Sequence, residues 1–411
     1  MAACTPTLMP PPYLYSAAGV PLFGELAPEL ATPYLETLYV TDRSAEYDDA
    51  GAVQYGYGRS PSVAYGSVRF KVGRDLQWED LVAYSTGDSS RVRRLGLRLE
   101  SITELGRMPA TPYLFRAETK GLELAPEVLA EQSESLKRAR EVLLSRLALT
   151  PRKEVFVFVH GVGTDFEKAT RYAAEAWHFL GREGVPIAYT WPAGRGGLLF
   201  YAYDRESGEY TIFHFKQLLE LLASIPEIEK VHILSHSRGT DVVTTALREL
   251  VIGSRAAGRD PRQHFKIGNL ILIAPDLDFG VVMQRIVAEA LGPAFERITV
   301  YVNADDGALS MANALFDSRL RLGELQRSKL SDEQRAVLDE TANLDIVSYQ
   351  GKIGGQFGHG YFRENPAVSS DILATVRFGL RPGEGLRGGL EPMEDGSNFW
   401  VIGDDYLKTP Q

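Results

Sequence analysis

The sequence predicts an α/β fold with a mostly parallel central sheet and helices on both of its faces. Between residues 154 and 379, short apolar runs of strand length alternate with segments whose apolar residues recur at helical spacing. One such run, V-H-I-L at 231–234, stops at S-H-S-R-G, and a helical pattern begins at once. This alternation favours parallel strands, because each parallel connection needs a crossover segment such as a helix.

The expected elements follow one another in a regular order. An amphipathic helix is predicted over 126–149, because apolar residues recur there at helical spacing among Glu, Lys and Arg. Strands are then predicted at 154–160, 186–191, 230–235, 267–274, 297–303 and 343–349. Helices are predicted between and after them, at 165–182, 210–224, 238–253, 279–290 and 367–379.

Shifts in composition divide the chain. Residues 1–34 are rich in Pro and Ala and are expected to form an extended arm. Residues 35–124 contain short β-like runs separated by Gly, Asp and Ser, which predicts a β-rich extension. The alternating region at 125–383 is expected to be the main α/β domain, and a Gly/Pro-rich tail follows at 384–411.

Ser237 lies where an expected strand meets an expected helix. In a nucleophile elbow, a strand-to-helix turn is so sharp that one serine is thrust out of the backbone. Such a turn needs small residues two positions before and after the serine. Gly239 meets this requirement, and Ser235 stands where glycine is usual. A Ser/Gly-rich turn without a chemical role is the plain alternative.

Three further segments supply the other parts of a nucleophilic site. Gly161 and Val162 follow a buried strand, and their backbone N–H groups, with that of Arg238, are candidate oxyanion donors. A later strand delivers Asp306 to its carboxyl end, and a glycine-rich loop beyond the last core strand carries His359. Ser, then Asp, then His is one of the chain orders known for a catalytic triad.

These segments together resemble the α/β-hydrolase superfamily over residues 154–382, and more narrowly a bacterial branch of hydrolases of unknown function with an S-H-S-x-G elbow. The motifs that carry the resemblance are F-V-H-G at 158–161, T-W-P at 190–192, Y-D-R-E-S at 203–207, S-H-S-R-G at 235–239, A-P-D at 274–276, D-G-A-L at 306–309 and G-H-G-Y-F at 358–362. The chain departs from the branch in the loop after Gly161, which reads V-G-T-D, and at Arg238, where methionine is more usual. The resemblance implies an α/β-hydrolase fold and a triad of Ser237, Asp306 and His359 that needs no cofactor or metal.

The identity of the triad acid stays open among three residues. Asp306 is preferred, because D-G-A-L matches the place where the branch has its acid. Asp276 is the alternative, since it also ends a strand and some α/β hydrolases take their acid from that strand. Asp305 would face the opposite way after an extended strand, where successive side chains alternate.

Candidate pocket residues lie in two places. Tyr203 and Asp204 belong to a polar segment at 203–207 that is either a charged capping loop or a wall of the substrate pocket. Phe200 and Tyr201, just before it, could give that pocket an aromatic side. His236 adjoins the candidate nucleophile. The remaining histidines are expected to be structural, in the core for His232, beside the site for His160, and at the surface for His178, His214 and His264.

Composition excludes several classes of function. The formal net charge is −10 at pH 7 and no basic cluster appears, so nucleic acid is not an expected partner. One cysteine excludes an internal disulfide, and no Cys/His cluster has the spacing of a zinc site. No apolar stretch approaches the roughly 20 residues that span a bilayer. With 411 residues and 44% hydrophobic content, the chain can bury one large core with accessories, or two domains.

The first residues, M-A-A-C, resemble the end of a bacterial lipobox. If a fuller precursor exists, Cys4 would be its acylated residue, and the protein would be tethered to a membrane of the cell envelope. The alternative is a coincidental A-A-C before a proline-rich segment. As written, the chain carries no export signal, and its localisation is otherwise not indicated.

The function expected from these observations is hydrolysis of carboxylic esters through an acyl-enzyme on Ser237. Esters of short acyl chains or aryl acids are the expected substrates, since no long apolar lid helix is evident. Thioesterase and acyltransferase activities are alternatives within the same chemistry. A different class of function is a non-catalytic envelope scaffold that keeps the fold.

Overall fold

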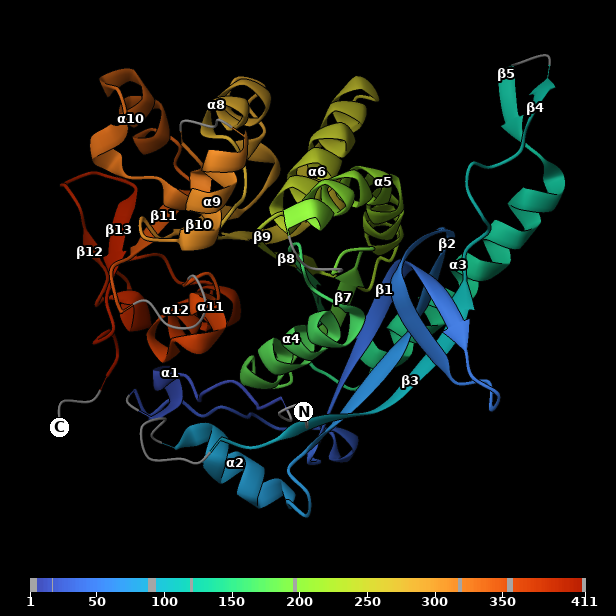
Figure 1. The fold of residues 1–411 in the computed structure, drawn as a ribbon, viewed down its shortest axis with the longest axis horizontal. Helices are drawn as coiled ribbons and strands as arrows, with labels where there is room; N and C mark the ends of the chain where they lie inside the picture. Colours follow the sequence, from blue (N-terminus) through green and yellow to red (C-terminus); the bar gives the residue numbers. More distant parts are fainter. Residues whose placement is uncertain are drawn as a thin grey trace.

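A computed structural model shows one large twisted sheet with helices on both faces (Figure 1). The structure describes residues 6–16, 18–87, 94–118, 121–194, 198–316, 320–352 and 358–408, so Cys4 and the side chain of Phe200 lie outside the described part. The strand order of the large sheet is β12-β13-β11-β10-β9-β8-β6-β7-β1-β2-β3. Strands β1, β6 to β11 and β13 are parallel, whereas β2, β3 and β12 pair antiparallel near the two edges.

The core strands agree with the predicted ones to within one residue at either end. They are β6 (Glu154–Val159), β7 (Val185–Thr190), β8 (Lys230–His236), β9 (Ile267–Ile273), β10 (Arg297–Val302) and β11 (Leu344–Tyr349). The helices are α3 (Pro126–Leu147), α4 (Phe166–Phe179), α5 (Leu198–Ala223), α6 (Gly239–Ala256), α7 (Pro261–Phe265), α8 (Phe279–Val282), α9 (Gly307–Phe316), α10 (Asp332–Asp339), α11 (Tyr361–Glu364) and α12 (Pro366–Phe378). The predicted α/β-hydrolase fold class, with its mostly parallel sheet, is confirmed.

Each face of the sheet has its own apolar core. In β6, Val155 and Val157 join the core under α3, α5 and α6, while Phe156 and Phe158 join the core under α4 and α12. This division follows from the pleat, since successive strand residues face opposite sides. Both faces are therefore covered (Figure 1), and β6 is apolar from Val155 to Val159, as buried parallel strands usually are.

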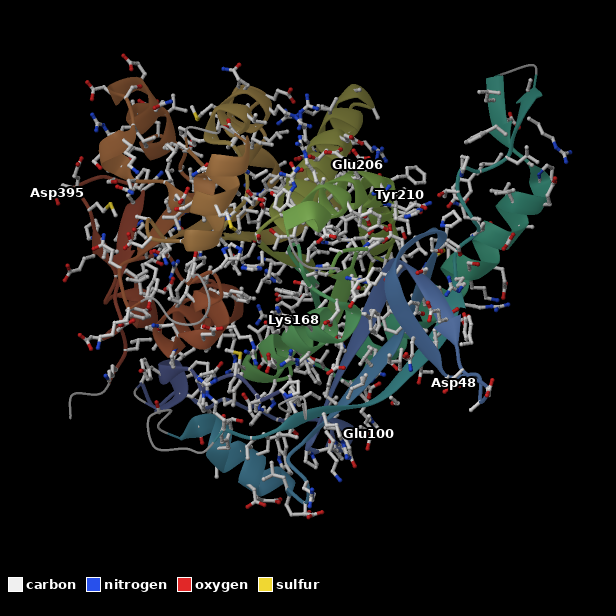
Figure 2. All side chains as sticks on the ribbon, in the orientation of Figure 1. Asp48, Glu100, Lys168, Glu206, Tyr210 and Asp395 are labelled. Atoms are coloured by element: carbon white, nitrogen blue, oxygen red, sulfur yellow. The ribbon has the colours of Figure 1, made fainter. Side chains whose placement is uncertain are left out.

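The predicted β-rich N-terminal region is present and extends the central sheet. It comprises β1 (Tyr34–Tyr47), β2 (Val53–Val72), α2 (Trp78–Thr86), β3 (Leu97–Arg107) and a small separate hairpin of β4 (Phe115–Glu118) and β5 (Gly121–Leu124). Strand β1 pairs parallel with β7. Asp48, labelled in Figure 2, closes the β1–β2 turn, because its carboxylate accepts the N–H groups of Ala50 (3.0 Å) and Ala52 (2.8 Å).

Both ends of the described chain are packed against the body of the protein. Before β1, the chain forms the short helix α1 (Tyr13–Ser16), and the side chains of Leu8, Leu14 and Leu22 are buried in the core under α12. In the predicted tail, β12 (Glu391–Pro392) and β13 (Phe399–Ile402) join the edge of the sheet beside β11. No helix of the described residues is long and apolar enough to cross a membrane.

A buried ion pair joins the tail to α12. The guanidinium of Arg387 donates from Nε and Nη2 to the two carboxylate oxygens of Asp371, at 2.7 and 2.9 Å, and both side chains are fully buried. The hydroxyls of Tyr301 (2.7 Å) and Tyr406 (3.2 Å) also donate to this carboxylate. Four donors thus converge on one buried anion.

Replacing Arg387 with Met should lower the free energy of unfolding by about 3–5 kcal/mol, because it leaves an uncompensated buried carboxylate. Urea denaturation followed by circular dichroism measures the change. The double variant Arg387→Met/Asp371→Leu should recover much of the loss, since both charges are then removed. A single variant as stable as the wild type would show that the pair is not buried in solution.

Candidate active site

Ser237 occupies the turn between β8 and α6 in a strained conformation. Its φ is 54°, in the left-handed region that residues other than glycine seldom adopt. The Ser237 N–H donates to the carbonyl of Ile273 (2.9 Å), and its own carbonyl accepts the N–H (3.1 Å) and hydroxyl (2.6 Å) of Thr240. Ser235, two residues earlier, is fully buried. Backbone strain held in this way by its surroundings is typical of functional sites.

Two glycines allow neighbouring backbone to lie very close to this turn. A Cβ on Gly239 would stand 2.3 Å from the carbonyl oxygen of His160. A Cβ on Gly161 would stand 2.6 Å from the Cβ of Ser237 and 3.1 Å from its Oγ. A larger residue at either position would have to displace backbone, so the loop after β6 lies directly against Ser237.

The contact between Gly161 and Ser237 lies at the point in the sheet where the order of successive strands reverses. Strand β6 lies between β7 and β8, and the helices that follow β6 and β8, α4 and α6, cover opposite faces. In open α/β sheets, the carboxyl ends of the strands at such a point border a crevice where ligands bind. Ser237 and Gly161 follow the two strands that meet there.

His359 and Asp306 are in direct contact. Nδ1 of His359 lies 2.6 Å from Oδ2 of Asp306. The aspartate is fully buried, and its Oδ1 accepts the backbone N–H groups of Ala308 (3.0 Å) and Leu309 (3.2 Å) at the start of α9. The fixed carboxylate favours the tautomer with a proton on Nδ1, which leaves Nε2 as a free acceptor.

His236 connects the loop of His359 to the serine turn. Its Nε2 lies 3.1 Å from the carbonyl oxygen of His359, and the two ring centroids are 4.6 Å apart. Burial, and then the neighbouring His359, lower the pKa of His236 well below its ordinary value. The ring is therefore neutral and donates from Nε2. The residue next to Ser237 in the chain thus holds the backbone of His359.

The two alternative acids have other surroundings. The carboxylate of Asp276 pairs with Arg321 and accepts the hydroxyl of Tyr201. The side chain of Asp305 is exposed to solvent. Asp306 is the aspartate that contacts the loop histidine, so the geometry favours it over both alternatives as the partner of the imidazole.

A buried arginine from β1 reaches the loop after β6. The guanidinium of Arg43 donates to the carbonyl of Thr164 at 2.7 Å and to Nε2 of His160 at 3.3 Å. The His160 ring stacks on Trp191, and its Nδ1 donates to the carbonyl of Gly161 at 2.8 Å. Burial, and then the positive charge of Arg43, hold the pKa of His160 well below its usual value. The only sequence signal for Arg43 is its position, since it is a charged residue soon after an apolar strand run. That position alone does not predict a role at the site.

The expectation of a loop at 203–207 is wrong, because these residues lie inside α5. Asp204 is buried, and its Oδ2 accepts the N–H groups of Gly163 (2.9 Å) and Gly194 (3.3 Å), in the loops after β6 and β7. The hydroxyl of Tyr203 donates to a backbone carbonyl of β2 at 3.0 Å. Both side chains therefore brace the loops and the N-terminal strands around the site, and contact with a substrate stays a prediction.

Two histidines predicted at the surface are buried instead. The ring of His178 lies 2.8 Å from the hydroxyl of Ser85, and Nδ1 of His214 lies 2.8 Å from the carboxylate of Asp42. These partners come from distant parts of the chain, so local sequence did not reveal them. His232 is buried, as expected. Among the described residues, no cluster of three or more His, Cys, Asp or Glu could hold a metal ion.

A mostly parallel sheet, a strained serine on a strand-to-helix turn and a His–Asp pair linked to that turn through His236 fit an α/β hydrolase. Residues 135–377 match the family described as "Alpha/beta hydrolase of unknown function (DUF900)". The chain belongs to this family. A search of the curated proteins gives no match.

Proposed function

We propose that this protein is a serine hydrolase that cleaves carboxylic esters through an acyl-enzyme on Ser237. The observation that carries the proposal is the 2.6 Å contact between His359 and Asp306, in a loop held against the strained serine turn by His236. A serine hydroxyl is almost fully protonated at neutral pH, so it needs an adjacent base to attack a carbonyl. An imidazole oriented by a buried carboxylate is such a base.

In the proposed reaction, Ser237 Oγ bonds to the acyl carbon while its proton passes to Nε2 of His359. The carbonyl π electrons move to the oxygen, and the oxyanion then collapses and expels the alcohol, which takes the proton from the imidazolium. Water attacks the acyl-enzyme in the same way and releases the acid. Asp306 keeps the Nδ1 proton in place and stabilises the positive charge of the ring during both steps.

The proposed oxyanion donors are the N–H groups of Arg238 and Val162, with Gly161 nearby. Arg238 precedes α6, whose first N–H groups have no partner within the helix and favour negative charge. The Gly161 carbonyl accepts a hydrogen bond from Nδ1 of the His160 ring. Because a trans peptide directs its N–H opposite to its C=O, the Val162 N–H faces away from the His160 ring.

A fluorophosphonate probe and an ester panel test this proposal. The wild-type protein should be labelled on Ser237, as read by peptide mass spectrometry, and should hydrolyse p-nitrophenyl acetate or butyrate. Varying chain length and aromatic content then defines the substrate class. Turnover of acyl thioesters in place of esters would indicate a thioesterase. Acyl transfer to an added alcohol would indicate an acyltransferase, and both use the same acyl-enzyme. Absence of both labelling and turnover would instead support a non-catalytic scaffold, for which attachment to the envelope through Cys4 stays a proposal.

Arg43→Met should lower kcat by about 100-fold with little change in KM, because the loop that carries the proposed oxyanion donors loses its brace. The variant removes the donors to the carbonyls of Thr164 and Ala193 and to the ring of His160. Steady-state kinetics on p-nitrophenyl butyrate measure the effect. Arg43→Lys keeps the charge without the planar fork, so it should rescue the rate only in part.

Arg182→Met is a matched control for that variant. Arg182 is also a buried arginine, and it donates to the carbonyls of Leu30 and Thr32 at the far end of α4. The Arg182→Met variant should lose about as much stability as Arg43→Met, but it should keep the wild-type kcat. Equal losses of activity in the two variants would mean that Arg43 acts only through global stability.

A further inference from the structure

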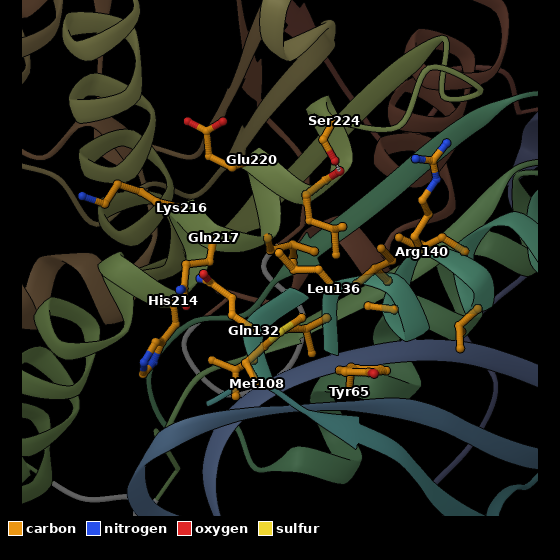
Figure 3. Close-up of a pocket in the computed structure, with 18 of the residues that line it drawn as sticks. Tyr65, Met108, Gln132, Leu136, Arg140, His214, Lys216, Gln217, Glu220 and Ser224 are labelled. Carbon is orange, nitrogen blue, oxygen red and sulfur yellow. Dashed lines mark hydrogen bonds between the residues drawn. The ribbon is translucent and has the colours of Figure 1, made fainter. Parts of the chain in front are cut away.

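A large cavity lies away from the proposed catalytic residues, between α3 and α5 (Figure 3). Its volume is about 650 Å³. Strands β1, β2 and β7 form its floor through residues such as Leu38, Val63 and Ile187. Pockets that bind drug-sized ligands usually have about 300–1,000 Å³, so this cavity has the size of a ligand site. Its lining contains none of the proposed triad or oxyanion residues.

The walls of the cavity are mainly apolar. Leu136 of α3 and Tyr65 of β2 are among the lining residues labelled in Figure 3. Leu143 from α3, with Leu218 and Leu221 from α5, adds further aliphatic surface. Apolar surface that two helices leave uncovered is costly in water, and an apolar ligand would remove that cost.

The charged residues that line the cavity differ in how strongly they are ion-paired. Lys216 is paired with Glu249 at 2.5 Å. Arg140 contacts Glu227, but that pair is half-exposed and 3.4 Å apart, so it contributes little and can be exchanged. Lys137 is exposed and has no ion-pair partner among the described residues.

Lys137 and Arg140 stand three residues apart on α3, which places them on the same side of the helix. Both line the cavity, in a chain whose net charge is −10. Glu220 of α5 also lines the cavity, and its carboxylate lies 3.4 Å from the ring of His264. The two cations can therefore hold an anionic group at the edge of an apolar space.

We propose that this cavity is a binding site for a long-chain carboxylate, whose hydrocarbon chain lies between α3 and α5 and whose carboxylate lies at Lys137 and Arg140. The pairing follows from complementarity: apolar walls match the chain, and the two cations match the head group. This site is separate from the crevice at Ser237 and does not depend on the proposed ester hydrolysis.

Isothermal titration of the full chain with dodecanoate, below its micellar concentration, tests the proposal. The wild type should bind one dodecanoate per chain. Dodecyltrimethylammonium, which has an alkyl chain of nearly the same length and the opposite charge, should bind more weakly. Equal binding of the two amphiphiles would overturn the assignment of the head group. No saturable binding of dodecanoate would overturn the site itself.

Leu136→Trp tests the location, because the larger ring fills the space between the helices. It should abolish binding, whereas Leu129→Trp, on the same helix but half-exposed and outside the cavity, should leave binding unchanged. Thermal unfolding of both variants shows that each is folded. Equal binding by the two tryptophan variants would place the ligand elsewhere.

The double variant Lys137→Glu/Arg140→Glu tests the head-group contacts. It should weaken dodecanoate binding by about tenfold or more, and it should not weaken binding of dodecyltrimethylammonium. Arg138→Glu makes one such charge reversal at a neighbouring α3 position that does not line the cavity, so it should bind dodecanoate like the wild type. Unchanged dodecanoate affinity in the double variant would contradict a carboxylate at these cations.

Discussion

Ser237→Ala should lower kcat for p-nitrophenyl butyrate by about 10⁴–10⁶-fold and abolish fluorophosphonate labelling. The reason is that the variant lacks the oxygen that would bond to the acyl carbon. The backbone there is fixed by hydrogen bonds to Ile273 and Thr240 that do not involve the hydroxyl of Ser237. The variant should therefore fold normally, and its thermal unfolding should match that of the wild type.

Ser254→Ala is a matched control. Ser254 lies on α6 and is buried, and its hydroxyl has no hydrogen-bond partner among the described residues. Removing it should change neither the rate nor the labelling. If Ser237→Ala kept the full wild-type rate, the nucleophile would have to be another residue. A wild type no faster than the uncatalysed reaction would favour the scaffold function.

Asp306→Asn should reduce kcat by about 10⁴-fold, because an amide no longer fixes the protonated Nδ1 of His359 or stabilises the imidazolium. Asp276→Asn is the informative comparison, since the carboxylate of Asp276 pairs with Arg321 instead of the His359 ring. That variant should lose stability through the broken buried pair, but it should keep its kcat within about tenfold. Steady-state rates and thermal unfolding, measured on both variants, separate the two effects.

The opposite pattern would reassign the acid. If Asp276→Asn lost the larger factor in kcat while remaining folded, the carboxylate after β9 would be the partner of the base in solution. A loss shared equally by both variants would indicate that the two carboxylates act through one network around α5 and α9.

The strands that carry the candidate site could be predicted because they are buried on both faces. Runs such as E-V-F-V-F-V in β6 have no amphipathic alternation, and they are too short for buried helices. The candidate site residues at the carboxyl ends of these strands could be predicted for a related reason. Polar residues that follow an apolar strand within a few positions, such as Ser237 after β8 and Asp306 after β10, mark the edge of a parallel sheet.

The first half of α5 could not be predicted as a helix from the sequence. The polar run at 203–207 is followed by Gly208, which indicates a turn on local grounds. In the structure, Asp204 accepts backbone N–H groups from two loops, and the hydroxyl of Ser207 accepts Nε of Arg59 at 3.0 Å. Gly208 faces α6, where an added Cβ would stand 3.5 Å from Val242. Tertiary contacts therefore override the turn signal.

The sequence by itself determined the class of fold, the strand-to-helix turn at Ser237 and the order of the three candidate triad residues, because each of these rests on neighbours in the chain. Only the tertiary structure decided that Asp306 contacts His359 and that Arg43 braces the loop beside Ser237. It also revealed the cavity between α3 and α5. The physical reason is the same in each case: hydrogen bonds and packing join groups that are close in space but far apart in the chain, and spacing along a single sequence carries no record of them.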